Sequence, residues 1–407
     1  MNRLLFLIFI FPTLLLASFR GYIIDANTSQ PIVGATISDA TITTKSDNNG
    51  SFFLDSNETL YHVKAYGYRP FHFSSQRISP IIKLRPIKVK ALYLTFWGAS
   101  NNSKTLKKIL NIVDKTEVNA VIVDVKNAYG STSFLTGFKQ ANSYGAQKHR
   151  TNRNIQKFIR TMRAHDIYTI ARIVTFKDEI QASHNPQYAI KREDNGTIWR
   201  NHDNMAWVDP FDKRAHAYAI AMAEEAAKVG YDEINFDYIR FPAKTGLHYC
   251  KQCIESTRVK AIEDFLDEAR KKLRKYGVFI SVDTYGNICW TKDDNGIGQT
   301  VESFAAHADY MCPMLYPSGF SSGSFYFKHP AQHPYEVVYR SIKKIQNKIP
   351  SERVRPWLQY FRDYTATHKV YNKKEIQAQI QASEDIGANG WMLWSPSSKY
   401  KLNDLIK

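Results

Sequence analysis

The sequence predicts an α/β protein in which a (β/α)8 barrel follows a small all-β sandwich. A chain of 407 residues has room for two or three ordinary domains, or for one large barrel with an appendage. Before Pro86 the apolar runs are short and separated by turn residues, whereas from Lys90 onward they alternate with amphipathic stretches. The apolar fraction of 43% is enough for a core, and it excludes a disordered, collagenous or coiled-coil chain.

Residues 1–18 are typical of a secretory signal peptide. A basic start precedes an apolar run from Leu4 to Leu16, and the small residues Ala17 and Ser18 follow it. The run is shorter than the roughly 20 residues that a spanning helix needs, and no later segment approaches that length. We therefore expect a periplasmic or secreted protein without a stable membrane span after cleavage; an uncleaved N-terminal anchor is the alternative.

Residues 19–87 carry several short strand-like runs with turns between them, which predicts a small β-sandwich. The runs cover residues 21–25, 31–37 and 51–54. The segment resembles the carboxypeptidase regulatory-like domain through Gly21, Asp25, Pro31, Gly34, Ala35, Asp47, Gly50, Phe52 and residues 66–68. That module is a non-catalytic accessory, so the resemblance implies a structural or adhesive role.

Residues 88–407 predict the barrel, because parallel strands need crossover helices and eight such units close into a domain of about 250 residues. The expected strands are residues 91–97, 120–125, 168–176, 233–239, 278–283, 310–316, 355–361 and 390–394. The expected helices are residues 104–115, 155–165, 213–229, 259–276, 299–308, 335–348 and 374–386. An open doubly wound sheet is the alternative, but the first crossover lacks a glycine-rich phosphate turn. We therefore expect no nucleotide and no other cofactor.

Carboxylates end three of the expected strands, and the carboxyl ends of barrel strands build the active site. Asp237 ends the fourth strand, Asp283 the fifth and Asp124 the second. Neighbouring strands are roughly 4.8 Å apart, so the first two should face one cavity. Glycoside hydrolysis needs such a pair, one to protonate the leaving oxygen and one to attack or to activate water. The alternatives are an Asp237–Arg240 ion pair and, for the other two, hydrogen-bonded positions at the barrel rim.

Side chains suited to a polyol also gather at the expected strand ends. Aromatic faces stack on the C–H faces of sugars, while amide, carboxylate and guanidinium groups bind hydroxyls. This mixture suits a carbohydrate better than a phosphate or a metal. The candidate substrate-binding residues are Trp97, Lys126, Arg172, Lys177, Asp178, Arg240, Tyr316, Gln359 and Trp394.

The barrel region resembles a family of bacterial envelope proteins, the putative glycosyl hydrolase domain family. The motifs that carry the resemblance lie at residues 124–130, 171–178, 207–210, 230–242 and 311–317. The resemblance implies a glycosidase-like barrel whose layout is related to the α-amylase-like enzymes, with Asp237 as nucleophile or charge stabiliser. Asp283 stands where those relatives carry the acidic Glu, and Asn127 stands where an acidic residue is expected.

Other chemistries lack their motifs. The histidines fall in expected helices or loops rather than at strand ends, so we expect no catalytic metal. One C-x-x-C motif, Cys250 with Cys253, is half a zinc site or a redox pair. In an oxidising compartment a disulfide among Cys250, Cys253 and Cys289 is the simplest expectation. A serine triad has no G-x-S-x-G elbow to start from.

The net charge of +17, from 55 Lys and Arg against 38 Asp and Glu, needs its own interpretation. A secreted protein rarely meets nucleic acid, so we expect no nucleic-acid partner. Most of the cations solvate helix faces, and the remaining field attracts anionic envelope polymers. An acidic or phosphate-bearing polysaccharide is therefore slightly favoured as the substrate.

Together these patterns predict an exported glycosidase that cleaves O-glycosidic bonds of a polysaccharide. Asp237 is the expected nucleophile and Asp283 the general acid/base, with Asp124 as the substitute for either. A non-catalytic carbohydrate-binding or envelope-scaffold barrel is the first alternative, and a metal-dependent deacetylase is the second.

Overall fold

A computed structural model describes residues 18–56, 58–74 and 80–406. The expected signal peptide lies outside these residues, apart from Ser18. In the described part of the chain, no helix has both the length and the apolar composition needed to cross a membrane.

The N-terminal strands form two small sheets that pack on each other around Ile23, Ile37, Phe52 and Val63. One sheet has the order β4-β1-β7 and the other β3-β2-β5-β6. This confirms the expected all-β unit before the barrel. The strands are β1 (Ser18–Asp25), β2 (Thr36–Ser38), β3 (Thr43–Lys45), β4 (Ser51–Asp55), β5 (Leu60–Lys64), β6 (Phe71–Ser74) and β7 (Ile81–Leu84).

The following strands close into a parallel barrel with the order β10-β12-β14-β15-β16-β17-β8-β9, which confirms the predicted (β/α)8 fold. The strands are β8 (Val89–Leu94), β9 (Ala120–Lys126), β10 (Tyr168–Val174), β12 (Glu233–Asp237), β14 (Phe279–Tyr285), β15 (Tyr310–Met314), β16 (Trp357–Gln359) and β17 (Gly390–Trp394). The main outer helices are α1 (Lys104–Val113), α3 (Ile155–Ala164), α5 (Lys213–Val229), α6 (Glu255–Leu273), α7 (Val301–His307), α8 (Pro334–Ile345) and α9 (Lys373–Asp385). Shorter helices are α2 (Lys139–Ser143), α4 (Glu179–His184) and α10 (Leu402–Leu405).

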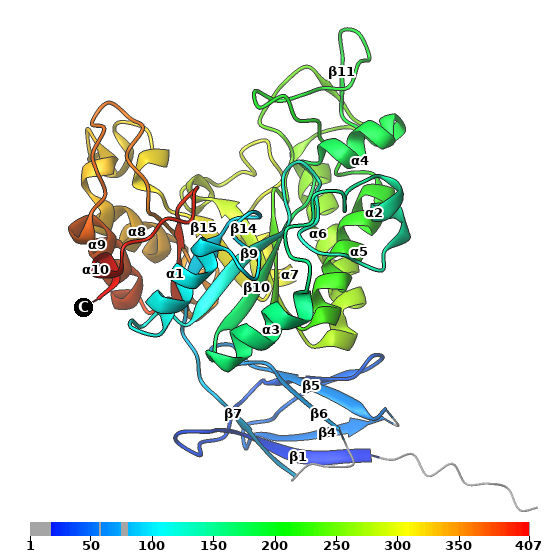
Figure 1. Ribbon diagram of the computed structural model, residues 1–407, viewed down its shortest axis with the longest axis vertical. Coiled ribbons are helices and arrows are strands. Elements are labelled where there is room, and N and C mark those ends of the chain that lie inside the picture. The colour runs from blue at the N-terminus through cyan, green and yellow to red at the C-terminus, as the bar shows by residue number, and fades with distance from the viewer. Residues whose placement is uncertain (1–17, 57, 75–79, 407) are drawn as a thin grey trace, which may run out of the picture.

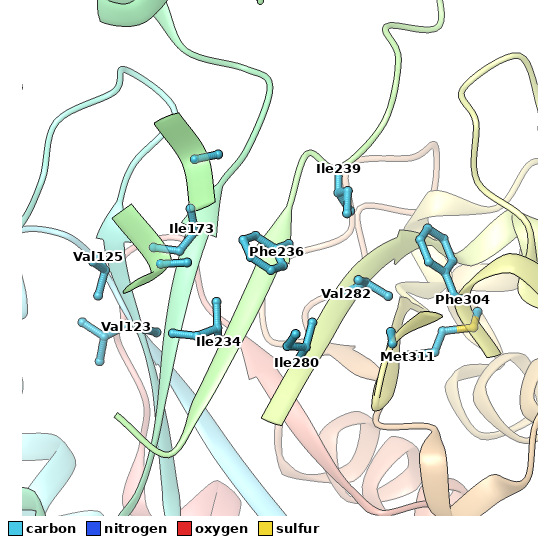
Figure 2. Packing of buried hydrophobic residues seen from close by; sticks show 14 of the residues in the cluster. Val123, Val125, Ile173, Ile234, Phe236, Ile239, Ile280, Val282, Phe304 and Met311 are labelled. Atoms are coloured by element: carbon cyan, nitrogen blue, oxygen red, sulfur yellow. The ribbon is translucent and has the colours of Figure 1, made fainter. Parts of the chain in front are cut away.

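Alternation along each barrel strand separates the core from the site. Successive side chains of a strand point to opposite faces, and the apolar set that includes Val123, Phe236 and Val282 packs in one cluster with residues of the surrounding helices. Figure 2 shows these side chains beside one another on neighbouring strands. The residues between them, such as Asp124 and Asp283, therefore point into the barrel.

A buried ion pair closes the barrel interior near the amino ends of its strands. Arg355 Nη1 donates to both carboxylate oxygens of Glu233, at 2.8 and 2.9 Å, and Tyr168 Oη donates to Glu233 Oε2 at 2.9 Å. The Arg355 guanidinium also lies over the Tyr310 ring, 4.4 Å from its centroid. Burial of both charges makes each dependent on the other, because neither reaches water.

Replacing Arg355 by Met is expected to lower the free energy of unfolding by about 3–5 kcal/mol, because Glu233 then keeps a buried charge without its cation. Urea denaturation followed by circular dichroism measures the change. Lys272→Met, at an exposed position on α6, is the control and should change stability by less than about 0.5 kcal/mol. A loss as small as the control's would contradict the assigned role of the pair.

The β-sandwich docks at the end of the barrel where the strands begin (Figure 1). Lys64 Nζ forms an ion pair with Asp309 Oδ2 at 2.9 Å and donates to the Val278 carbonyl at 3.0 Å. Tyr310 Oη accepts from the Gly67 amide at 3.1 Å. These contacts occupy the amino ends of the strands and leave the carboxyl ends open.

Candidate active site

Strand register places the polar side chains of four strands at one level inside the barrel. Arg172 on β10 is opposite Asp124 on β9 and Asn235 on β12, and Asn235 is opposite Ser281 on β14. Asp237 and Asp283 each lie two residues further along their strands, and so face the same side. The barrel therefore presents both predicted catalytic carboxylates just above this layer.

Arg172 holds the carboxylates together. Its Nη2 forms an ion pair with Asp237 and its Nη1 with Asp124, while its Nε lies 3.0 Å from Asp237 Oδ2. The same Nε is 3.9 Å from Asp283 Oδ2. The Trp394 ring lies 5.2 Å from the guanidinium carbon. One buried cation thus contacts all three predicted carboxylates and fixes their arrangement.

Asp283 lies in the least polar surroundings of the three. Burial raises the pKa of its carboxyl well above the usual value, and the nearby Asp237 charge raises it further, whereas Arg172 opposes both effects. Its Oδ1 accepts hydrogen bonds from Trp357 Nε1 at 2.7 Å and from Asn235 Nδ2 at 2.8 Å. These contacts fix the side chain in one orientation, with its other oxygen on the side of Arg172.

Asp237 ends β12 at a sharp change of backbone direction. The next residue, Tyr238, has a left-handed backbone with φ of 50°, which costs about 1–3 kcal/mol for a residue other than glycine. The Tyr238 amide donates to Asp237 Oδ1 at 2.6 Å. This turn holds the Asp237 carboxylate and places the Tyr238 ring beside it in the cavity wall.

A cavity of about 180 Å³ contains the two carboxylates, Asp237 and Asp283. A larger cavity of about 550 Å³ shares Tyr238, Arg240 and Tyr285 with it. On the other side, a cavity of about 270 Å³ shares Tyr285, Met314 and Tyr316. The three cavities form one groove across the barrel mouth, with the carboxylates at its centre.

Six of the residues predicted from the sequence line the central cavity. They are Arg172, Asp237, Arg240, Asp283, Tyr316 and Trp394. Lys177 lines the larger cavity. Asp124 lies behind Arg172, and its Oδ2 accepts from Tyr93 Oη at 2.6 Å. Trp97 is 69% exposed in the loop after the first barrel strand, outside the walls of these three cavities.

Direct substrate binding by Lys126, Asp178 and Gln359 is not consistent with the structure. Lys126 Nζ and Asp178 Oδ2 form an ion pair at 2.8 Å, and both side chains are 0% exposed. Gln359 Nε2 donates to Ser318 Oγ at 2.7 Å, and its amide accepts no solvent because it too is buried. These side chains satisfy one another or the loops that follow the strands, so they support the rim.

Two other expectations are also corrected. Asp237 pairs with Arg172 and not with Arg240, because Arg172 comes from the adjacent strand and points into the barrel at the same side. The expected disulfide is absent, since all four cysteines are free. Cys250 instead donates its backbone amide to Asp209 Oδ2 at 2.7 Å. Over the described residues, no cluster of three or more His, Cys, Asp or Glu side chains could hold a metal.

The sequence reasoning missed several residues of the groove. Trp357, which orients Asp283, was inside an expected strand but was not singled out. Tyr285 follows Asp283 by two residues, so strand alternation could have identified it. Trp199 and Trp207 lie in the long segment after β10, where β11 (Lys191–Arg192) pairs with β13 (Leu247–His248) above the barrel mouth (Figure 1). Their segment showed no helix or strand period.

The fold and this two-carboxylate groove define a barrel of the glycoside hydrolase class. The chain belongs to the family described as putative glycosyl hydrolase domain, which matches residues 91–400. This confirms the resemblance found in the sequence and supports a glycosidase. No curated protein matches the chain significantly.

Solved structures show the same fold. The glycoside hydrolase domain of PgaB (BpsB) from Bordetella bronchiseptica is 12% identical, with a TM-score of 0.54 over 77% of this chain and 95% of that one. A hypothetical protein from Ruminiclostridium thermocellum is 33% identical, with a TM-score of 0.42 over 47% of this chain and 96% of that one. The spore cortex-lytic enzyme SleL from Bacillus megaterium is 13% identical, with a TM-score of 0.47 over 83% and 77%.

Proposed function

We propose that the barrel hydrolyses O-glycosidic bonds in an envelope or extracellular polysaccharide, with Asp237 and Asp283 as its catalytic pair. The observation that carries this proposal is the contrast between two carboxyl groups in one cavity. Asp283 is buried with a raised pKa, while Asp237 forms an ion pair with Arg172. Environments that separate the proton affinities of two neighbouring acids assign one as the acid and the other as the anion.

In the proposed reaction, protonated Asp283 donates its proton to the glycosidic oxygen as the bond to the leaving sugar breaks. The Asp237 carboxylate attacks the anomeric carbon, or stabilises the positive charge that develops there. Water then completes the hydrolysis, and its proton returns to Asp283. Arg172 keeps Asp237 in place, and Asp124 and Tyr93 fix Arg172. Asp124 is thus a positioning residue in this scheme.

The groove supports a polymer as the substrate. It extends to both sides of the carboxylates, and aromatic side chains line each part, among them Trp207, Tyr285 and Tyr316. Several sugar units of one chain can stack along it. We also infer export, because residues 1–18 have the pattern of a signal peptide, and we assign the β-sandwich an accessory role at the far end of the barrel.

Release of reducing ends from a panel of envelope and extracellular polysaccharides tests the proposal. The mature protein should release reducing ends from at least one polymer, and a chelator should leave the rate unchanged, because two carboxylates need no metal. Loss of activity with the chelator would favour the deacetylase alternative, as would release of acetate without reducing ends.

A further inference from the structure

The larger cavity of the groove is basic and aromatic. Lys177, Arg200, Arg240 and Lys244 line it, and among its described lining residues there is no Asp or Glu. Two of these cations have carboxylate partners outside the lining. Lys177 Nζ is 2.8 Å from Asp203 Oδ2, and Arg200 pairs with Glu179. The other two, Arg240 and Lys244, have none within the described part of the chain.

Arg240 is the unusual member of this set, because it is only 9% exposed. Its Nη1 donates to the Phe241 carbonyl at 3.0 Å. Aromatic rings surround the guanidinium carbon, with the centroids of Tyr285, Trp207 and Tyr238 at 4.6, 5.0 and 5.2 Å. Such rings attract a cation, but a buried guanidinium still lacks partners for most of its N–H groups. Its position in the walls of both cavities directs this unmet demand into the groove.

We propose that Arg240, with Lys244 at the cavity edge, binds an anionic group on the sugar unit next to the cleaved bond, so that the substrate is an acidic polysaccharide. This inference rests on the proposed function and specifies its substrate class. A planar carboxylate matches the guanidinium fork and forms paired hydrogen bonds with it. The tryptophan and tyrosine rings of the same cavity stack on the sugar that carries the acid.

Affinity electrophoresis of the full-length mature protein tests the proposal without requiring catalysis. The native gels contain polygalacturonate, alginate, dextran sulfate or neutral pullulan, at an ionic strength that screens long-range attraction. Polygalacturonate or alginate should retard the wild type, and Arg240→Gln should weaken that binding at least about tenfold. Retardation by dextran sulfate alone, with the same loss in Arg240→Gln, would assign the anion as a sulfate ester rather than a carboxylate.

Lys272→Gln is the matched control, because it removes one charge from the exposed face of α6 and should bind as the wild type does. Circular dichroism confirms that each variant is folded, and Arg240→Lys should restore part of the binding if charge is what matters. Equal retardation of wild type and Arg240→Gln by the acidic polymers would overturn the proposal, as would binding to pullulan alone or to no acidic polymer. Cleavage of a neutral polymer would overturn it while leaving the proposed hydrolase function intact.

Discussion

Asp237→Asn is expected to lower kcat for polymer hydrolysis by roughly 10³-fold or more, because the amide can neither attack the anomeric carbon nor balance the charge that develops there. The substitution keeps the size of the side chain, so Kd for the polymer should change by less than about threefold. Initial rates of reducing-end release give kcat, and binding to the same polymer gives Kd.

The control for this variant is Asp267→Asn, a carboxylate on the outer helix α6 that pairs with His307 at 2.7 Å. It should retain the wild-type rate, and circular dichroism should show an unchanged fold for both proteins. An Asp237→Asn enzyme that keeps its rate within about tenfold would show that the carboxylate has no chemical role.

Asp283 is expected to set the alkaline side of the pH profile. Because burial raises the pKa of this carboxyl, it is protonated below that raised pKa and loses its proton above it. Activity should therefore fall as pH rises through a value well above the roughly 3.9 of an ordinary Asp. Asp283→Asn should lose about 10²–10⁴-fold in kcat on the polymer, together with this limb of the profile.

The leaving group provides an independent check on Asp283. A dinitrophenyl glycoside of a sugar that the enzyme accepts needs no protonation on departure, so Asp283→Asn should cleave it at close to the wild-type rate, whereas Asp237→Asn should not. Equal loss on the polymer and on the aryl glycoside in Asp283→Asn would remove Asp283 from the role of acid.

The barrel strands were predictable because each is an apolar run that ends in polar residues. The expected strand at residues 390–394 matches β17 (Gly390–Trp394), and residues 120–125 fall within β9 (Ala120–Lys126). Strand alternation also placed Asp124, Asp237 and Asp283 on the interior face. Expected strands ran past the observed ends at residues 91–97 and 355–361, because aromatic residues continue into the loops there.

Side-chain pairing was not predictable in the same way. Lys126 and Asp178 stand at the ends of different strands, and nothing in their spacing shows that they neutralise each other inside the rim. Arg172 had the composition of a sugar-binding residue, but its register places it between two carboxylates. Such partnerships depend on which strands are neighbours and on the level that each side chain reaches.

The basic cavity illustrates a further limit. Its tryptophans come from a loop segment without regular period, and the rings that enclose Arg240 come from three separate segments of the chain. The net charge of +17 suggested an acidic polymer only as a general attraction. The structure adds one buried cation without a carboxylate partner in the described chain, beside the catalytic pair.

The central claim is that the carboxylates around Arg172 cleave the polysaccharide that the groove binds. Its most direct test measures binding and reducing-end release in the same samples, for the mature wild type and for Asp237→Asn, across the polysaccharide panel. The account predicts a polymer that both proteins bind and only the wild type cleaves. A polymer that both bind equally, with no release by either from any member of the panel, would contradict it and identify the barrel as a carbohydrate-binding scaffold.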